Sequence, residues 1–427
     1  MCYDSAIMNR LARHLGRTAS SDRTTSSAEP RVAALRSAPA SVPLIVHVMT
    51  IPGSLVFLRG QIAHVRKAGF SVHVITSPGD ELLDFVAHEG VGMDAIPMPR
   101  AITPFQDLVA LVRLWRALRR LRPEIVHSHT PKGGLLGMVA ASLAGTPVRM
   151  YHIRGLPFVT ETGWRRRLLR STEWISCALA HRVLAVSRSM RDIAIEEGLC
   201  APEKIAVLLG GSGNGVDATG RFTPQPSSVR GAERKRFGIP EDALVIGFVG
   251  RLTRDKGVIE LASAWQRLRE RDPRLHLLLV GFDELDRRFA DVVAALRADP
   301  RVHDPGEQSD MPRVYAAMDV VALPTYREGF PNVALETAAM SLPIVATNVP
   351  GCVDAVQDGV TGLLVPARDP DALAAALERY LADPELRARH GQASRQRVLR
   401  EFRQESIWDL IVAEYRTLLA SRTLGPR

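Results

Sequence analysis

The sequence lacks most of the features that mark disulfide-rich, metal-binding or membrane-spanning proteins. Its 427 residues include only four cysteines, which are scattered and form no C-x-x-C pair, so we expect neither a disulfide framework nor a cysteine metal site. No run of about 18 uninterrupted apolar residues is present, which argues against a transmembrane helix. A signal-peptide core is also missing, and we therefore expect the protein in a reducing cytoplasm.

Aromatic residues are scarce, at 5% of the chain, and no basic motif interleaved with aromatic side chains occurs. We therefore expect no nucleic-acid partner. Basic residues are instead in excess, because 55 Lys and Arg face 46 Asp and Glu and give a formal net charge of +9. Apolar residues make up 46% of the chain and its length is sufficient for two α/β domains, each with its own core.

Apolar runs and amphipathic patterns alternate along the chain. The first half predicts strands at residues 44–49, 71–75, 124–127, 147–152, 183–186 and 204–208. Helical patterns lie between them at residues 55–67, 82–88, 105–121, 134–143 and 164–180. Strands return at residues 244–250, 275–280, 320–323 and 344–347, and helical patterns at 258–269, 370–381 and 385–420. This alternation predicts βαβ units and parallel sheets.

Changes in composition predict the domain boundaries. Residues 1–42 are rich in Ser, Thr, Ala and Arg without a sustained period, which predicts a disordered tail. A first domain spans residues 43–220, a segment rich in Pro, Ser and Arg at 221–240 predicts a linker, and a second domain spans 241–402. A last helix occupies residues 403–427. Its apolar stripe consists of Ile407, Leu410, Ile411, Tyr415 and Leu418.

Two glutamates eight positions apart follow the apolar run at 320–324. Glu328 lies in a glycine-containing turn, and Glu336 lies inside the helix that comes next. Gly329 allows backbone to approach a ligand closely, and Pro331 suits the first helical position. Free amides at a helix start bind anions, while carboxylates beside them accept hydrogen bonds from hydroxyl groups. Phosphate and polyol recognition in one place indicates a nucleotide sugar; two solvated surface acids are the alternative.

A second pattern lies upstream. The predicted strand at 244–250 ends at Gly250 and is followed by Arg251 and Lys256, five positions apart, and then by Gly257. Cations at the carboxyl end of a parallel strand are well placed to bind a pyrophosphate.

Together these two patterns resemble the donor site of the retaining glycosyltransferases of family 4, over residues 43–416. The resemblance implies the GT-B fold, an α/β architecture of two Rossmann-like parallel-sheet domains facing across a cleft. It also implies that the last helix crosses back to the first domain, with packing inside the second domain as the alternative. The first domain would bind the acceptor and the second the nucleotide sugar. Sugar transfer from a donor, expected to be a UDP-sugar, to an acceptor hydroxyl would retain the anomeric configuration.

The resemblance also implies roles for single residues. Arg251 and Lys256 would hold the donor diphosphate, Glu328 would contact the transferred sugar, and Glu336 would bind the ribose hydroxyls. No Asp-x-Asp pair stands where a metal would bridge the phosphates, so we expect no divalent metal and no cofactor. The implied donor site comprises Gly250, Arg251, Lys256, Glu328, Gly329, Phe330, Pro331, Asn332 and Glu336.

In the first domain, His129 resembles the family's histidine that faces the active site, and we count it as a catalytic candidate. A structural role is the alternative. We expect His127 to be buried and to point to the opposite side of its strand. Three runs, at residues 129–134, 154–158 and 210–217, are most similar to members that extend polyprenyl-diphosphate-linked sugars in surface polysaccharide or glycan assembly.

Arginines gather on two predicted helices of the first domain, in one case next to Trp164. They are Arg113, Arg116, Arg119, Arg120 and Arg122, and Arg165, Arg166, Arg167 and Arg170. Such segments suit an anionic membrane surface, so we expect peripheral attachment to the inner face of the cell membrane; a solvated helix face is the alternative. Two other functions stay open, a UDP-sugar 2-epimerase of the same architecture and a catalytically silent nucleotide-sugar-binding scaffold.

Overall fold

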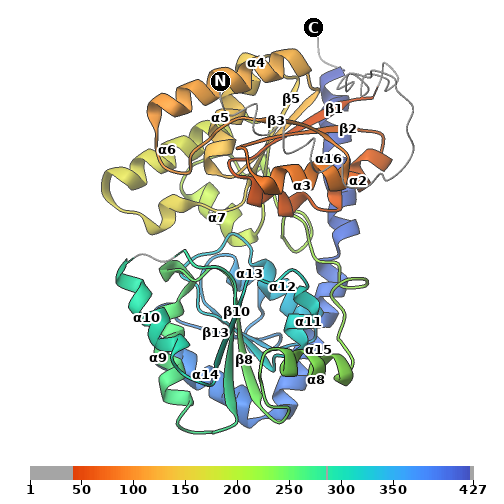
Figure 1. The fold of residues 1–427 in the computed structure, drawn as a ribbon. Helices are drawn as coiled ribbons and strands as arrows, with labels where there is room; N and C mark the ends of the chain where they lie inside the picture. The colour runs from red at the N-terminus through yellow and green to blue at the C-terminus, as the bar shows by residue number, and fades with distance from the viewer. Residues whose placement is uncertain (1–41, 285–286, 424–427) are drawn as a thin grey trace, which may run out of the picture.

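The computed structural model describes residues 42–284 and 287–423, which form two α/β domains, one above the other in Figure 1. The predicted N-terminal tail lies outside the described residues except for its last position. No helix within the described ranges is long and apolar enough to cross a membrane.

The first domain is built on a parallel sheet of seven strands in the order β3-β2-β1-β4-β5-β6-β7. Its strands are β1 (Leu44–Val48), β2 (Ser71–Thr76), β3 (Gly92–Ala95), β4 (Ile125–His129), β5 (Val148–Ile153), β6 (Arg182–Ala185) and β7 (Ile205–Ala206). Its helices are η1 (Pro52–Leu58), α2 (Gln61–Lys67), α3 (Asp80–Glu89), α4 (Pro104–Leu121), α5 (Pro131–Leu143), η2 (Pro157–Thr160), α6 (Gly163–Leu179) and α7 (Arg188–Glu196). Strands β1 and β4 are almost fully buried, as expected for central strands covered by helices.

The second domain contains a parallel sheet of six strands in the order β10-β9-β8-β11-β12-β13. Its strands are β8 (Leu244–Val249), β9 (Leu275–Val280), β10 (Val302–Gly306), β11 (Val320–Leu323), β12 (Ile344–Thr347) and β13 (Leu363–Val365). Its helices are α8 (Ser227–Arg236), η3 (Arg254–Lys256), α9 (Val258–Leu268), α10 (Arg287–Arg297), α11 (Met311–Ala316), α12 (Asn332–Ala339), α13 (Cys352–Ala355), α14 (Pro370–Ala382) and α15 (Pro384–Glu401). The two parallel sheets confirm the predicted fold class.

The last helix, α16 (Gln404–Thr423), leaves the second domain and runs along the first, as Figure 1 shows. Ile407, Ile411 and Tyr415 are buried in one apolar cluster with Ile45, and with other residues of the first domain. The hydroxyl of Tyr415 lies 2.7 Å from Nδ1 of His127. The expectation that this helix crosses back to the first domain is therefore confirmed.

Some predicted boundaries are wrong. The helical pattern at 385–420 is interrupted at Phe402, which is fully buried in the second domain and whose carbonyl oxygen accepts a hydrogen bond from Val216, so the last helix begins at Gln404, one residue after the predicted position 403. The helix predicted at 55–67 is divided at Gly60, which has φ 75°. Residues 227–236 of the predicted linker form α8, whose Arg230 and Arg234 both bind Asp319, so that part is folded onto the second domain.

Candidate active site

In both sheets the strand order reverses at one point, between β1 and β4 in the first and between β8 and β11 in the second. Open parallel sheets bind ligands at the carboxyl ends of the strands on either side of such a point. Thr50 and Thr130 follow β1 and β4, while Arg251 and Tyr326 come after β8 and β11. All four line one cavity of about 1540 Å³ between the two domains.

The two donor patterns are brought together by a glycine. A side chain on Gly257 would lie 1.9 Å from the carbonyl oxygen of Pro324, so only glycine lets this loop lie against the end of β11. Lys256 consequently reaches the turn after β11, where its Nζ lies 2.5 Å from Oε1 of Glu328. The two charges that the sequence separates by more than seventy positions form one partly buried ion pair.

Arg251 lies nearer to solvent, with 30% of its side chain exposed, and forms an ion pair with Glu284. It lines the cavity, whereas Lys256, Glu328 and Glu336 do not. The cavity thus lies beside the predicted donor residues and extends mainly over the first domain, on the side where the acceptor is expected. Gly250, with φ 150°, precedes Arg251, and its carbonyl oxygen leaves no room for a side chain on Gly281.

Glu336 lies on α12 and accepts a hydrogen bond of 2.8 Å from the hydroxyl of Tyr315. Burial raises the pKa of Glu336 to about 7, although this hydrogen bond and the charge of Arg221 act in the opposite direction. The carboxyl group of Glu336 therefore changes between its protonated and ionised forms near neutral pH, whereas a solvated glutamate does so at lower pH.

The turn before α12 differs from the prediction in two respects. Pro331 is the residue that precedes the helix, and Asn332 occupies the first helical position. A side chain on Gly329 would lie 1.9 Å from the carbonyl oxygen of Arg154, so this glycine lets the second domain approach the backbone of the first. Phe330 lies against Gly211 of the first domain in the same way. The first amides of α12 have no acceptor within the helix.

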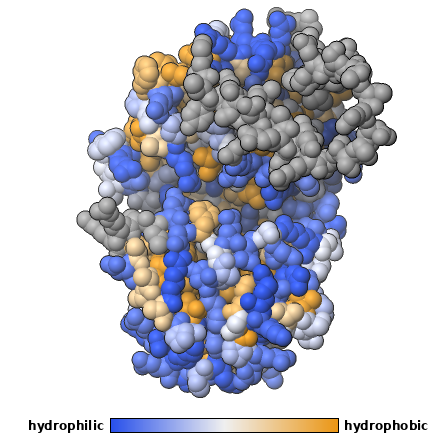
Figure 2. All heavy atoms as spheres, in the orientation of Figure 1, coloured by the Kyte–Doolittle hydropathy of each residue, from blue (hydrophilic) through white to orange (hydrophobic). Residues whose placement is uncertain are grey.

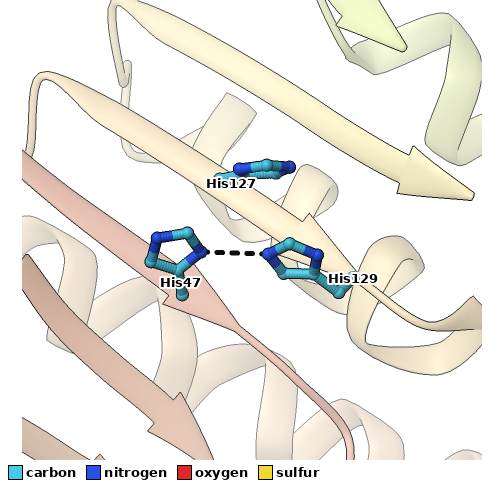
Figure 3. Close-up of side chains that lie close together, drawn as sticks. All are labelled: His47, His127 and His129. Atoms are coloured by element: carbon cyan, nitrogen blue, oxygen red, sulfur yellow. Dashed lines mark hydrogen bonds between the residues drawn. The ribbon is translucent and has the colours of Figure 1, made fainter. Parts of the chain in front are cut away.

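His129 does not face the cleft as expected. Its side chain is fully buried, and Figure 3 shows its ring beside His47 and His127. Arg154 donates from Nε to Nδ1 of His129 at 3.1 Å, so a neutral ring carries its proton on Nε2, which lies 3.0 Å from Nδ1 of His47. Both nitrogens of His129 are thus engaged within the protein. Burial holds the pKa of His129 well below its usual value.

The expectation that His127 points away from His129 is wrong. The two side chains are two positions apart on β4, so they project from the same face of the strand, and their ring centroids lie 4.2 Å apart. His127 is buried, as expected.

The three histidines could be considered as metal ligands, since one nitrogen from each lies within 4.8 Å of the others. His47 and His129 already share a hydrogen bond, and Nε of Arg154 donates to the other nitrogen of His129. No carboxylate of the residues that the structure describes is near enough to share this set of ligand atoms, so a buried divalent cation would face a positive charge without compensation. The cluster therefore fits a metal ion poorly.

Thr50 and Thr130 belong to the site but carry no sequence signal. Their hydroxyl oxygens lie 2.7 Å apart, and Oγ1 of Thr50 accepts a hydrogen bond from the amide of Gly133 at the start of α5. Thr130 has φ 65°, a conformation that a β-branched residue rarely adopts and that costs about 1–3 kcal/mol. Strain of this kind is concentrated at functional sites, which supports placing the active site here.

Comparisons with other proteins identify the family of the chain. Residues 229–397 match the family described as glycosyl transferases group 1, and residues 52–211 match the glycosyl transferase 4-like domain. The chain is 34% identical over 385 residues to the capsular polysaccharide biosynthesis glycosyltransferase CapM of Staphylococcus aureus, which covers 88% of this chain and 97% of that protein.

A second relative is the UDP-Gal:alpha-D-GlcNAc-diphosphoundecaprenol alpha-1,3-galactosyltransferase of Escherichia coli. It is 27% identical over 321 residues, covering 74% of this chain and 81% of that protein. Among solved structures, HepE of Anabaena in complex with UDP and glucose has a TM-score of 0.74 at 19% identity, over 88% of this chain and all of that one. WaaG, involved in lipopolysaccharide biosynthesis, has a TM-score of 0.66 at 17% identity, over 87% of this chain and 98% of that one. The structural likenesses show a shared fold.

Proposed function

Because this chain belongs to the group 1 glycosyltransferases, we propose that it moves a hexose or N-acetylhexosamine from a UDP-sugar to a hydroxyl of a lipid-linked glycan, with retention at the anomeric carbon. The reaction would serve the assembly of a cell-surface polysaccharide or glycan. The name of the E. coli relative specifies a UDP-sugar and a diphosphoundecaprenol-linked acceptor, and UDP is bound in the Anabaena structure. Both observations support the donor and acceptor proposed here.

The ion pair between Lys256 and Glu328, in the turn that precedes α12, is the observation that carries this proposal. When the bond between the sugar and the donor phosphate breaks, its electron pair remains on the diphosphate, whose negative charge grows. In our proposal the ammonium of Lys256, the guanidinium of Arg251 and the first amides of α12 stabilise that charge. No metal ion is needed for this step in the proposal.

In the retaining reaction we propose, the acceptor oxygen attacks the anomeric carbon from the side that the leaving phosphate vacates. The acceptor proton passes to the phosphate oxygen that has just been released. This route requires no basic side chain in the first domain, which is compatible with a buried, neutral His129 whose two nitrogens are already engaged.

A donor screen tests the proposal directly. The purified protein would be incubated with UDP-glucose, UDP-galactose, UDP-N-acetylglucosamine or GDP-mannose, with and without a synthetic prenyl-diphosphate-linked N-acetylglucosamine. Release of UDP only in the presence of the acceptor is the expected result, and proton NMR of the product would show the anomeric configuration. Conversion of the UDP-sugar to its 2-epimer without net UDP release would favour the 2-epimerase, and binding with neither UDP release nor conversion would favour the silent scaffold.

Glu336 should make UDP binding depend on pH. With a pKa of about 7, the carboxyl group is ionised above neutrality and accepts hydrogen bonds from the ribose best in that form. Lowering the pH from 8 to 6 should weaken UDP binding up to about tenfold, because about one tenth of the carboxyl groups stay ionised at pH 6. Calorimetry on wild type and on Glu336→Gln would measure this. Because Glu336→Gln cannot titrate at this position, it shows how much of the pH dependence comes from protonation of UDP itself. If UDP affinity changes equally with pH in both proteins, Glu336 does not bind the ribose in its ionised form.

We propose that the protein attaches to a membrane through exposed apolar side chains and not through the arginine cluster Arg165, Arg166 and Arg167. Arg165 pairs with Glu161 at 3.5 Å and Arg166 forms an ion pair with Glu197, so these two charges are already partnered. Large apolar side chains are instead exposed at the starts of α4 and α6, where Phe105 is 80% and Trp164 69% exposed. Figure 2 shows apolar atoms gathered at the upper left, where α4 lies in Figure 1.

Residues at the starts of α4 and α6 line the same cavity, among them Ile102, Pro104 and Leu168. A lipid-linked acceptor held in that cavity would then have its lipid next to the exposed apolar side chains. We infer that this surface, rather than the arginine cluster, contacts the inner face of the cell membrane.

Replacing Phe105, Leu108 and Trp164 together by serine should reduce sedimentation with phosphatidylglycerol vesicles at least about tenfold, because three apolar anchors are lost. A control with Val56→Ser and Val360→Ser, which are also exposed, should sediment like wild type. A triple variant that still sediments would rule out this surface. If an Arg165, Arg166 and Arg167 to Ser variant alone loses binding, the electrostatic model is correct instead.

A further inference from the structure

Arg154 lies where the two domains meet, in the loop after β5. Three parts of the first domain hold its side chain. Nε donates to His129 at 3.1 Å, the guanidinium carbon lies 4.8 Å from the centre of the Phe57 ring, and a side chain on Gly213 would lie 2.2 Å from Nη1. Gly213 does not have a positive φ, so its backbone conformation does not require glycine. A larger residue would instead collide with the guanidinium of Arg154, which occupies the space beside it.

This guanidinium has no counter-ion in the described part of the chain. Its neighbours are a neutral imidazole, an aromatic ring and a glycine, whereas Arg251 on the other side of the cleft pairs with Glu284. Burial lowers the pKa of Arg154 to about 9, although the nearby Tyr415 acts in the opposite direction. An arginine in this state has a planar set of donors available for an anion.

The neighbouring turn suggests which anion. The carbonyl oxygen of Arg154 is the atom against which Gly329 packs, and Glu328, one position earlier, holds Lys256. The backbone of Arg154 therefore lies beside the turn that contains Glu328 in the second domain, while its guanidinium lies against first-domain side chains. We propose that its guanidinium binds a phosphate oxyanion, and specifically the diphosphate of the nucleotide-sugar donor. This inference rests on the proposed function.

The consequence is that the diphosphate is held from both domains. Lys256 and Arg251 would bind it from the second domain, and Arg154 from the first, so the leaving group is stabilised fully only when the domains are together. In this arrangement the buried histidines orient Arg154. His129 binds the guanidinium, and His47 holds His129, so that together they fix the plane of the guanidinium. His129 is then a positioning residue that acts through Arg154.

Calorimetric titration of UDP and of uridine into the full-length protein tests the proposal. Arg154→Gln should weaken UDP binding about tenfold and leave uridine binding unchanged, because only UDP carries the phosphates. Arg149→Gln on β5, the strand that leads to Arg154, is a matched control, since Arg149 donates to the carbonyl oxygens of Leu179 and Thr146, and it should bind UDP like wild type. A purely structural role for Arg154 would weaken both ligands or neither.

Gly213→Ala provides a second test in which the charge is kept but displaced, and it should weaken UDP binding in the same selective manner. Farnesyl diphosphate serves as a probe for an acceptor diphosphate. If Arg154→Gln and Gly213→Ala both lose affinity for farnesyl diphosphate while they bind UDP normally, the anion site stands but its assignment to the donor diphosphate is overturned. Unchanged affinity for both probes overturns the anion site altogether. Failure of the wild type to bind UDP overturns the proposed donor as well, so the two failures are distinguishable.

Discussion

Replacing Lys256 by alanine should lower kcat at least about a hundredfold while the protein stays folded. In the proposed reaction the ammonium stabilises charge that appears on the diphosphate as the sugar departs, so its loss should affect the transition state more than the ground state. The variant also leaves Glu328 as a partly buried carboxylate without its partner. Arg251→Ala should act in the same direction. Turnover and the thermal unfolding midpoint would be measured together.

The control is Arg267→Ala, which removes a cation from the outer part of α9, where Arg267 pairs with Asp371. It should keep wild-type turnover. Glu328→Ala should also reduce kcat, and the double variant with Lys256→Ala tells whether the glutamate does more than orient the lysine. A double variant no worse than Lys256→Ala would mean that Glu328 acts only through Lys256. Near-normal turnover in both Lys256→Ala and Arg251→Ala would refute the donor site.

Gly329→Ala should lower activity by about a hundredfold, although it removes no functional group. The added carbon would lie 1.9 Å from the carbonyl oxygen of Arg154 and 2.7 Å from its carbonyl carbon, and backbone cannot yield as a flexible side chain does. The two domains must separate locally to accommodate it. We expect a reduced kcat with each domain still folded, which activity assays and small-angle X-ray scattering would detect.

Gly231→Ala on α8 is the matched control, because nothing lies within 4 Å of the added carbon. It should leave activity unchanged and raise stability slightly, as glycine to alanine changes in helices do. Full activity of Gly329→Ala would show that the close contact between the domains is not part of the active arrangement.

Strands in the centre of the sheets were predictable from the sequence, whereas three of the four edge strands in the described part of the chain were not. The predicted ranges 275–280 and 320–323 coincide with β9 and β11, because continuous apolar runs are typical of strands buried on both faces. Strands β3, β10 and β13 were missed. Each lies at the edge of its sheet, and segments such as Gly92–Ala95 contain too few large apolar residues to give a signal.

The site was predictable only where a motif lies in one stretch of sequence. The motifs around Lys256 and Glu328 suggested a common pocket, and the structure joins them through Gly257 and Pro324. The position of His129 was not predictable, because Arg154 and His47 come from other strands and occupy its two nitrogens. The place of Thr130 in the site was not predictable either, since its unusual backbone conformation depends on the turn between β4 and α5.

The crossing of α16 also bears on the order in which the chain becomes structured during synthesis. The first domain emerges from the ribosome early, yet Ile407, Ile411 and Tyr415, which complete its apolar cluster, lie in the helix Gln404–Thr423 at the other end of the chain. Until translation is nearly finished, Ile45 and its neighbours have no such partners. The domain made first is therefore finished last, and nascent chains would expose this apolar surface to chaperones throughout the synthesis of the second domain.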